Sequence, residues 1–139
     1  MRNINFIKWI MKSNIRRWVL FLPISMICTL IASILWMILN QISMDRLMIS
    51  TESFAYNIYY MPTSGIIAGF IFIYIGGYIA PLTKIGLILF ALHLIYCCMS
   101  IYNYIFRFGQ PDYWMVLFYI FCIVGSLVAL IYLKNEFKE

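Results

Sequence analysis

The sequence predicts an all-α integral membrane protein in which four transmembrane helices form an antiparallel, up-down bundle. Apolar residues make up 65% of the 139 residues and charged residues only 11%, whereas soluble domains average about 45–50% and about 25%. The apolar residues form four runs long enough to cross a bilayer core about 30 Å thick. Half of the Lys and Arg residues precede the first run. A small domain cannot bury so much apolar surface in its own core, and we expect the excess to face lipid.

Residues 1–17 are expected to form a basic segment at the membrane interface. Lys8, Lys12 and Arg16 recur every four residues, with Arg17 beside them, and on a helix they would form one charged stripe. Such a stripe is typical of an interfacial helix on anionic lipid, and these residues are also candidate contacts for a cytosolic partner. The alternative is a frayed continuation of the first span, whose charges only set its orientation.

The transmembrane domain is expected over residues 18–133, followed by a short cytoplasmic tail at 134–139. Each predicted span is an apolar run bounded by polar, aromatic or turn residues, as expected at a membrane boundary. The predicted spans are 18–39, 63–80, 85–106 and 113–133.

Two connections between the spans are predicted to differ in length. Residues 41–62 are expected to form the only long loop, with its tyrosines at headgroup depth and a short helix starting near Ser50 or Thr51. The turn at 81–84 is short, so the spans on either side are expected to be antiparallel neighbours. Thr83 is a candidate N-cap for the third helix.

The distribution of basic residues predicts the orientation. With the amino terminus in the cytoplasm, only Arg46 and Arg107 of the ten Lys and Arg residues lie outside. The opposite orientation would invert this bias, against the positive-inside rule. We therefore expect both termini to be cytoplasmic. The Ile-, Tyr-, Asn- and Phe-rich composition favours a bacterial protein, and hence the bacterial inner (cytoplasmic) membrane.

Small residues recur at helical spacing in the second and fourth spans. Gly65 and Gly69 form a G-x-x-x-G pattern, which permits close backbone approach where lipid supplies no hydrophobic drive between helices. The pattern can serve contacts within one chain or between chains, and we favour contacts within one chain. The candidate helix-packing residues are Gly65, Gly69, Gly76, Ala80, Gly125 and Ala129.

His93 lies well inside the third span and is the chain's only histidine. Ionisable groups within the membrane are costly and often functional. On a helix, His93 shares a face with Ser100 and Tyr104, and these three residues are the candidate intramembrane polar site. The functional interpretation is a proton- or ligand-sensitive switch, or a pore-lining group. The alternative is a neutral imidazole bonded to a hydroxyl or carbonyl group of a neighbouring helix.

The chain lacks the motifs of a membrane enzyme. It has no Ser/His/Asp or His/Glu constellation and no Gly-rich phosphate loop, and we expect no catalysis, no metal and no cofactor. Cys97 and Cys98 are adjacent, so they form no C-x-x-C redox centre. Direct nucleic-acid binding is not expected either, because a position beside the membrane accounts for the few basic residues.

The expected function is that of a non-catalytic membrane anchor or sensor for a cytosolic partner. The protein would form a homo-oligomer within the membrane lipid. Small bacterial membrane subunits of multi-component systems, including phage-defence systems, share this size and topology. The alternative is an oligomeric channel or pore-forming effector, with a path lined by Ser25, Thr29, Ser33, His93 and Ser100. A third possibility is a transporter of a small solute or lipid, with Gly76 and Gly77 interrupting a helix.

Overall fold

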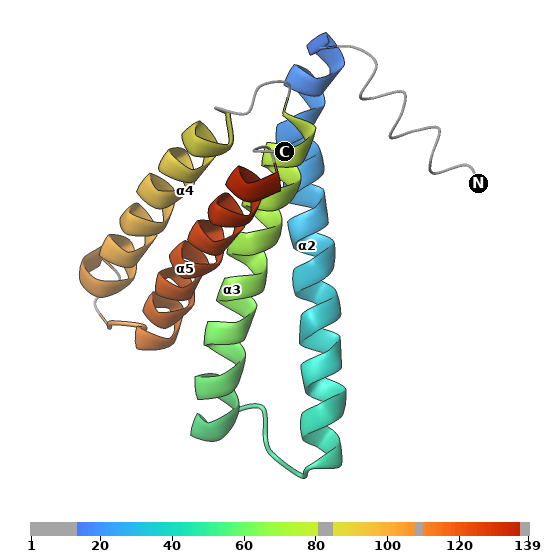
Figure 1. The fold of residues 1–139 in the computed structure, drawn as a ribbon. Coiled ribbons are helices and arrows are strands. Elements are labelled where there is room, and N and C mark those ends of the chain that lie inside the picture. Colours follow the sequence, from blue (N-terminus) through green and yellow to red (C-terminus); the bar gives the residue numbers. More distant parts are fainter. Residues whose placement is uncertain (1–13, 81–84, 108–109, 137–139) are drawn as a thin grey trace.

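A computed structural model describes residues 14–80, 85–107 and 110–136 (Figure 1). Within these ranges the chain is 90% helical and has no strands, which confirms the all-α prediction. The described part contains four helices that are long and apolar enough to cross a membrane. They are α2 (Asn14–Arg46), α3 (Phe54–Ile79), α4 (Ile85–Tyr102), which continues into a π-helical turn η1 (Asn103–Arg107), and α5 (Tyr113–Glu136).

Helix α2 extends beyond the predicted span at both ends. Its 33 residues rise about 50 Å at 1.5 Å per residue, more than the thickness of a bilayer core. Arg16 and Arg17 lie in its first turns, so this part of the basic segment is continuous with the long helix. Lys8 and Lys12 lie outside the described residues, as do the predicted turn at 81–84 and its candidate cap Thr83.

The prediction of a long loop over residues 41–62 is wrong. Helix α2 continues to Arg46 and α3 begins at Phe54, so the connection is only 47–53. Ser53 caps α3, because its side chain accepts a hydrogen bond from the backbone N–H of Tyr56 at 3.1 Å. This cap lets the tyrosine-rich segment start the same helix that forms the second span. The tyrosines predict a position at the membrane surface, but a segment at the membrane surface can be helical and need not be a loop.

Helix α3 is the central element and contacts the other three helices, most extensively α5. It runs antiparallel to α2. At one end of the pair, the Arg17 side chain of α2 donates to the Ile79 carbonyl oxygen of α3 at 2.8 Å. Farther along, Trp36 Nε1 donates to Thr63 Oγ1 at 3.2 Å.

Helices α3 and α5 run parallel. Near their starts, the rings of Phe54 and Trp114 lie 5.3 Å apart, and near their ends Gly77 faces Leu133. Gly86, at the start of α4, also approaches Leu133, which shows that α4 and α5 are antiparallel. Figure 1 shows the resulting arrangement, in which α2 and α4 lie on opposite sides of the α3–α5 pair.

The small residues of α3 and α5 form the contact between these two helices. A methyl group on Gly65 would overlap the carbonyl oxygen of Phe118, one on Gly69 that of Cys122, and one on Gly125 that of Ile66. Such contact between backbones is possible only without side chains at these positions. The G-x-x-x-G pattern therefore serves packing within the chain.

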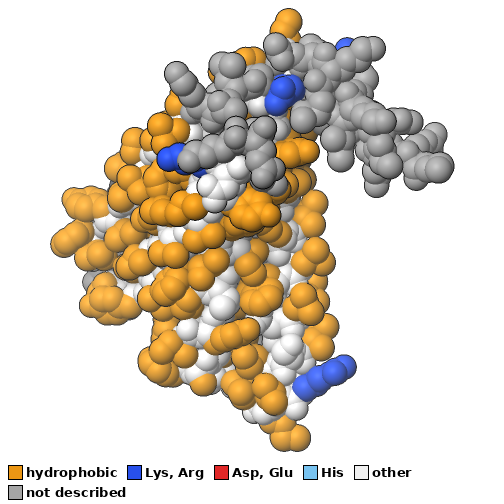
Figure 2. Space-filling view, viewed as in Figure 1, with side chains coloured by type: hydrophobic (Ala, Val, Ile, Leu, Met, Phe, Trp, Pro, Cys, Tyr) orange, Lys and Arg blue, Asp and Glu red, His pale blue; other side chains and the backbone are white. Residues whose placement is uncertain are grey.

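The other predicted packing residues also lie inside the chain. A methyl group on Gly76 would press against Leu89 of α4 and come within 3.5 Å of Ser25 of α2. Ala80 and Ala129 are buried in the same apolar cluster as Ile73. The bundle's exterior is nonetheless apolar: Figure 2 shows hydrophobic side chains along the visible face, with Lys and Arg near its ends.

Candidate functional site

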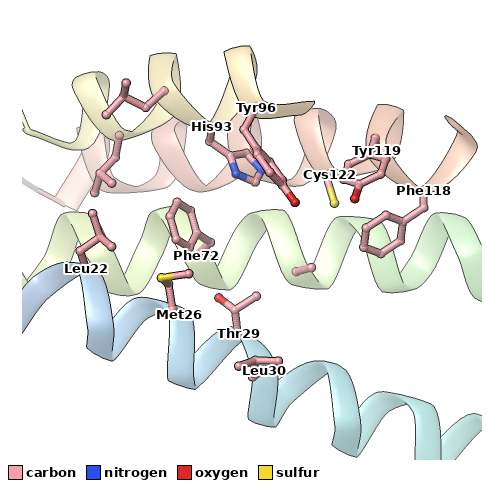
Figure 3. A pocket seen from close by; sticks show the side chains of 13 residues that line it. Leu22, Met26, Thr29, Leu30, Phe72, His93, Tyr96, Phe118, Tyr119 and Cys122 are labelled. Carbon is pink, nitrogen blue, oxygen red and sulfur yellow. The ribbon is translucent and has the colours of Figure 1, made fainter. Parts of the chain in front are cut away.

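A cavity of about 510 Å³ lies among the four helices (Figure 3). Its lining residues on α2 and α4 include Met26, Leu30 and Leu92, which are all exposed. Its lining residues on α3 and α5 include Ala68 and Cys122, which are buried. The mouth of the cavity therefore lies between α2 and α4, and its floor is formed by α3 and α5.

His93 is half-buried and forms part of the cavity wall. Its ring stacks on Phe72 of α3, with centroids 5.2 Å apart and planes inclined by 29°. Its Nε2 lies 3.5 Å from the Sγ of Cys97, one turn along the same helix. The sequence predicted that His93 faces the bundle, and the structure places it there. The hydrogen-bonding group beside it is a thiol of its own helix rather than a hydroxyl or carbonyl group of a neighbour.

The other two residues of the predicted polar site, Ser100 and Tyr104, follow His93 in the sequence and lie outside the cavity lining. Ser100 is half-buried in α4, and Tyr104 belongs to the π-helical turn η1. The Tyr104 ring lies 5.9 Å from that of Tyr119 on α5. Neither Ser100 nor Tyr104 lines the cavity.

Tyr96 and Tyr119 line the cavity in their place, and sequence reasoning did not single them out. Tyr96 follows His93 by three residues on α4, and its ring lies 6.5 Å from the imidazole. The Tyr96 and Tyr119 rings meet edge to face at 6.1 Å. The i, i+3 spacing of His93 and Tyr96 was a usable signal, because such residues share a helix face. No local signal placed Tyr119 of α5 beside them.

The polar stripe of α2 contributes one residue to the cavity. Thr29 lines it, whereas Ser25 is fully buried and Ser33 is half-buried. The Thr29 hydroxyl donates to the Ser25 carbonyl oxygen at 2.7 Å, and the Ser25 hydroxyl donates to Leu22 at 3.3 Å. Both hydroxyl protons are thus engaged by the backbone of α2, and the Thr29 oxygen faces the cavity as an acceptor.

Arg17 has a structural role that the sequence did not indicate. Its Nε and a terminal guanidinium nitrogen donate to the carbonyl oxygens of Ile79 and Ala80. These carbonyl groups lie at the end of α3, where backbone acceptors lose their helical donors. Arg16 is half-buried in the same turn of α2. The candidate partner surface therefore includes at least one residue that holds the fold together.

No group of three or more His, Cys, Asp or Glu residues within the described ranges is arranged to hold a metal ion. Cys97 and Cys122 are buried together with Ala68 in an apolar cluster beneath the cavity. The chemistry available in the cavity is therefore apolar contact, ring stacking and a few hydrogen bonds.

The fold and cavity define an all-helical class of protein whose described part has four helices long and apolar enough to cross a membrane, with a ligand-sized space open to the side of the bundle. Comparison of the chain with protein families, curated proteins and solved structures finds no match.

Proposed function

We propose that this multi-pass protein of the bacterial inner membrane is a non-catalytic sensor. It binds a lipid-dissolved ligand in the cavity between α2 and α4, and it anchors a cytosolic partner at the end of the bundle near Arg16. The observation that carries the proposal is the cavity: its volume of about 510 Å³ falls within the range of small-molecule sites, about 300–1,000 Å³.

The depth of the cavity supports entry of a ligand from the bilayer. Tyr96 lies near the centre of the candidate span Gly86–Phe106. Met26 and Thr29 follow Arg17 along α2 by about 14–18 Å at the helical rise of 1.5 Å per residue, close to half the thickness of a bilayer core. A mouth at this depth opens onto acyl chains rather than water.

The directions of the helices support an up-down arrangement across the membrane. Because α2 is antiparallel to α3, and α3 is parallel to α5, the start of α2 and the end of α5 lie at the same end of the bundle (Figure 1). The bias of basic residues supports a cytoplasmic location for this end. A multi-component system, such as one of phage defence, would supply the cytosolic partner.

The packing of the small residues alters the expected oligomer. The six predicted packing residues all lie against neighbouring helices or in the apolar core of one chain, so none is left to join two chains by close backbone contact. The proposed sensor therefore works without an oligomer built on these residues.

A channel is less well supported by the site. A conducting path needs polar groups along its length, but Ser25 is buried and its hydroxyl proton is engaged by its own helix. The apolar walls of the cavity suit a ligand dissolved in lipid better than an ion.

Native mass spectrometry of the detergent-purified protein tests the proposal. The wild-type protein should retain a bound small molecule from the membrane. Leu30→Trp, at the mouth of the cavity, should reduce its occupancy about tenfold, because the larger side chain enters the space. Ile31→Trp is the matched control, since Ile31 is exposed on the same helix and does not line the cavity. Wild-type protein free of any bound molecule, or equal loss in both variants, contradicts the proposal.

A further inference from the structure

The inner wall of the cavity is built largely from rings. They come from α3, α4 and α5, and adjacent rings are 5.2 to 6.5 Å apart. The ring-bearing residues are Phe72, His93, Tyr96, Phe118 and Tyr119. Flat ligands gain from stacking and edge contacts with such rings. The α2 side of the cavity is different: Figure 3 shows Leu22, Met26 and Leu30 facing the rings.

The polar atoms of the cavity are gathered within this ring wall. Figure 3 shows the His93 imidazole and the hydroxyl groups of Tyr96 and Tyr119 close together, with the Thr29 oxygen on the opposite side. An imidazole N–H and phenolic O–H groups can donate hydrogen bonds. No Lys, Arg, Asp or Glu is among the residues that line the cavity. A ligand here is therefore uncharged and carries an oxygen acceptor.

Depth separates two kinds of lipid-soluble ligand. Acyl lipids keep their ester and headgroup oxygens at the membrane surface, whereas Tyr96 lies near the middle of the candidate span Gly86–Phe106. The Nε2 of His93 already lies 3.5 Å from Cys97 Sγ, but an acyl chain in the cavity would offer no acceptor to the other imidazole nitrogen or to a phenolic proton of the tyrosines, which favours a ligand with an oxygen acceptor. A ring with its own carbonyl oxygen, free to move to mid-depth, would supply one.

We infer that the ligand of the proposed sensor is an uncharged ring bearing carbonyl oxygens and an apolar tail, the chemistry of an isoprenoid quinone. The ring lies against Phe72 and Phe118, and a carbonyl oxygen accepts a hydrogen bond from the Tyr96 hydroxyl group. The tail leaves between the aliphatic side chains of α2 and α4. This inference rests on the proposed function, because it assigns the ligand of the same cavity.

A titration of the purified protein with decylubiquinone, followed by native mass spectrometry, tests the ligand class. Two comparison compounds each lack one feature: decylbenzene has ring and tail without a carbonyl, and decyl acetate has carbonyl and tail without a ring. We expect one decylubiquinone to bind per chain, and each comparison compound to bind about tenfold more weakly, the loss expected for about 1.4 kcal/mol of contact.

Two tyrosine variants test the site. Tyr96→Phe keeps the ring and removes the hydroxyl that donates to the carbonyl oxygen, and it should weaken decylubiquinone binding about tenfold. Tyr102→Phe is the matched control, because Tyr102 is exposed on the same helix and does not line the cavity. Equal affinities for decylubiquinone in the two variants contradict the proposed contact.

The outcomes separate this inference from the proposed function. If the wild-type protein retains an acyl lipid that Leu30→Trp loses, and binds decylubiquinone no better than decylbenzene, the sensor stands and the quinone class is wrong. If Leu30→Trp and Ile31→Trp behave alike with every compound, the cavity is no binding site and both proposals fail.

Discussion

Arg17 and Ala80 are 63 residues apart, and the guanidinium group of one donates to the carbonyl oxygen of the other. A second bond from Arg17 reaches the carbonyl oxygen of Ile79 at 2.8 Å. The start of α2 is therefore tied to the end of α3 by a charged side chain that satisfies two acceptors left over at a helix terminus. A residue of the expected partner surface is thus part of the fold.

Replacement of Arg17 by alanine should destabilise the protein. The two carbonyl groups lose a charged donor, and hydrogen bonds to charged groups contribute about 1.5–3 kcal/mol each, less where water can replace them. We expect a loss of about 1–3 kcal/mol in the free energy of unfolding, measured by denaturant titration in mild detergent. Lys134→Ala, which removes an exposed cation at the same end of the bundle, is the control. Equal stabilities of the two variants would contradict a structural role for Arg17.

The contact between α3 and α5 gives a prediction about two glycines. A methyl group on Gly69 would overlap the Cys122 carbonyl oxygen, and backbone cannot move aside easily, so Gly69→Ala should cost about 1–3 kcal/mol of stability. Gly86 has room, since a methyl group there would lie 3.9 Å from Leu133. Gly86→Ala should be neutral or stabilising by up to about 1 kcal/mol, because alanine is the better helix former.

Thermal unfolding of the purified variants measures this difference. Similar midpoints for Gly69→Ala and Gly86→Ala would mean that α3 and α5 do not pack as closely as the structure places them.

The N-terminus of α3 provides a third prediction. Loss of the Ser53 hydroxyl in Ser53→Ala removes the acceptor for the Tyr56 N–H and should cost about 1 kcal/mol, the usual effect of removing an N-cap. Ser53→Asp restores an acceptor and should recover most of that loss. Hydrogen exchange at Tyr56 and the residues after it reports the same change locally. A variant Ser53→Ala with unchanged exchange there would show that the helix does not depend on this cap.

The helices and the small residues of their closest contact could be predicted from sequence, whereas the pairing of α3 with α5 and the cavity could not. Apolar runs and the Gly65–Gly69 spacing are local patterns, and close backbone contact needs small residues on the contacting face. The cavity depends on the position of α2 and α4 on opposite sides of α3 and α5, which no single helix specifies. His93 was found because it is rare within a span. Tyr119 was missed because its role depends on a neighbouring helix.

The loop over 41–62 was predicted incorrectly for a related reason. Tyrosines at the membrane surface indicate depth but leave the backbone conformation open. The signal for the start of the helix was Ser53, whose side chain caps α3, and the helix continues through Pro62. Pro62 lies inside α3, where the neighbouring turns retain their hydrogen bonds although proline donates none.

The proposed orientation makes a prediction that cysteine labelling can check in intact cells. Ser50 and Gln110 are exposed and lie in the connections α2–α3 and η1–α5, whereas Asn135 is exposed near the end of α5. If the termini are cytoplasmic, a membrane-impermeant maleimide added outside should label Ser50→Cys and Gln110→Cys but not Asn135→Cys. The unsubstituted chain, which has an exposed Cys98 and a half-buried Cys28 within its helices, measures the background. Labelling of Asn135→Cys alone would mean that the topology is the inverse of the proposed one. The Arg17 end, with the proposed partner surface, would then lie outside the cytoplasm.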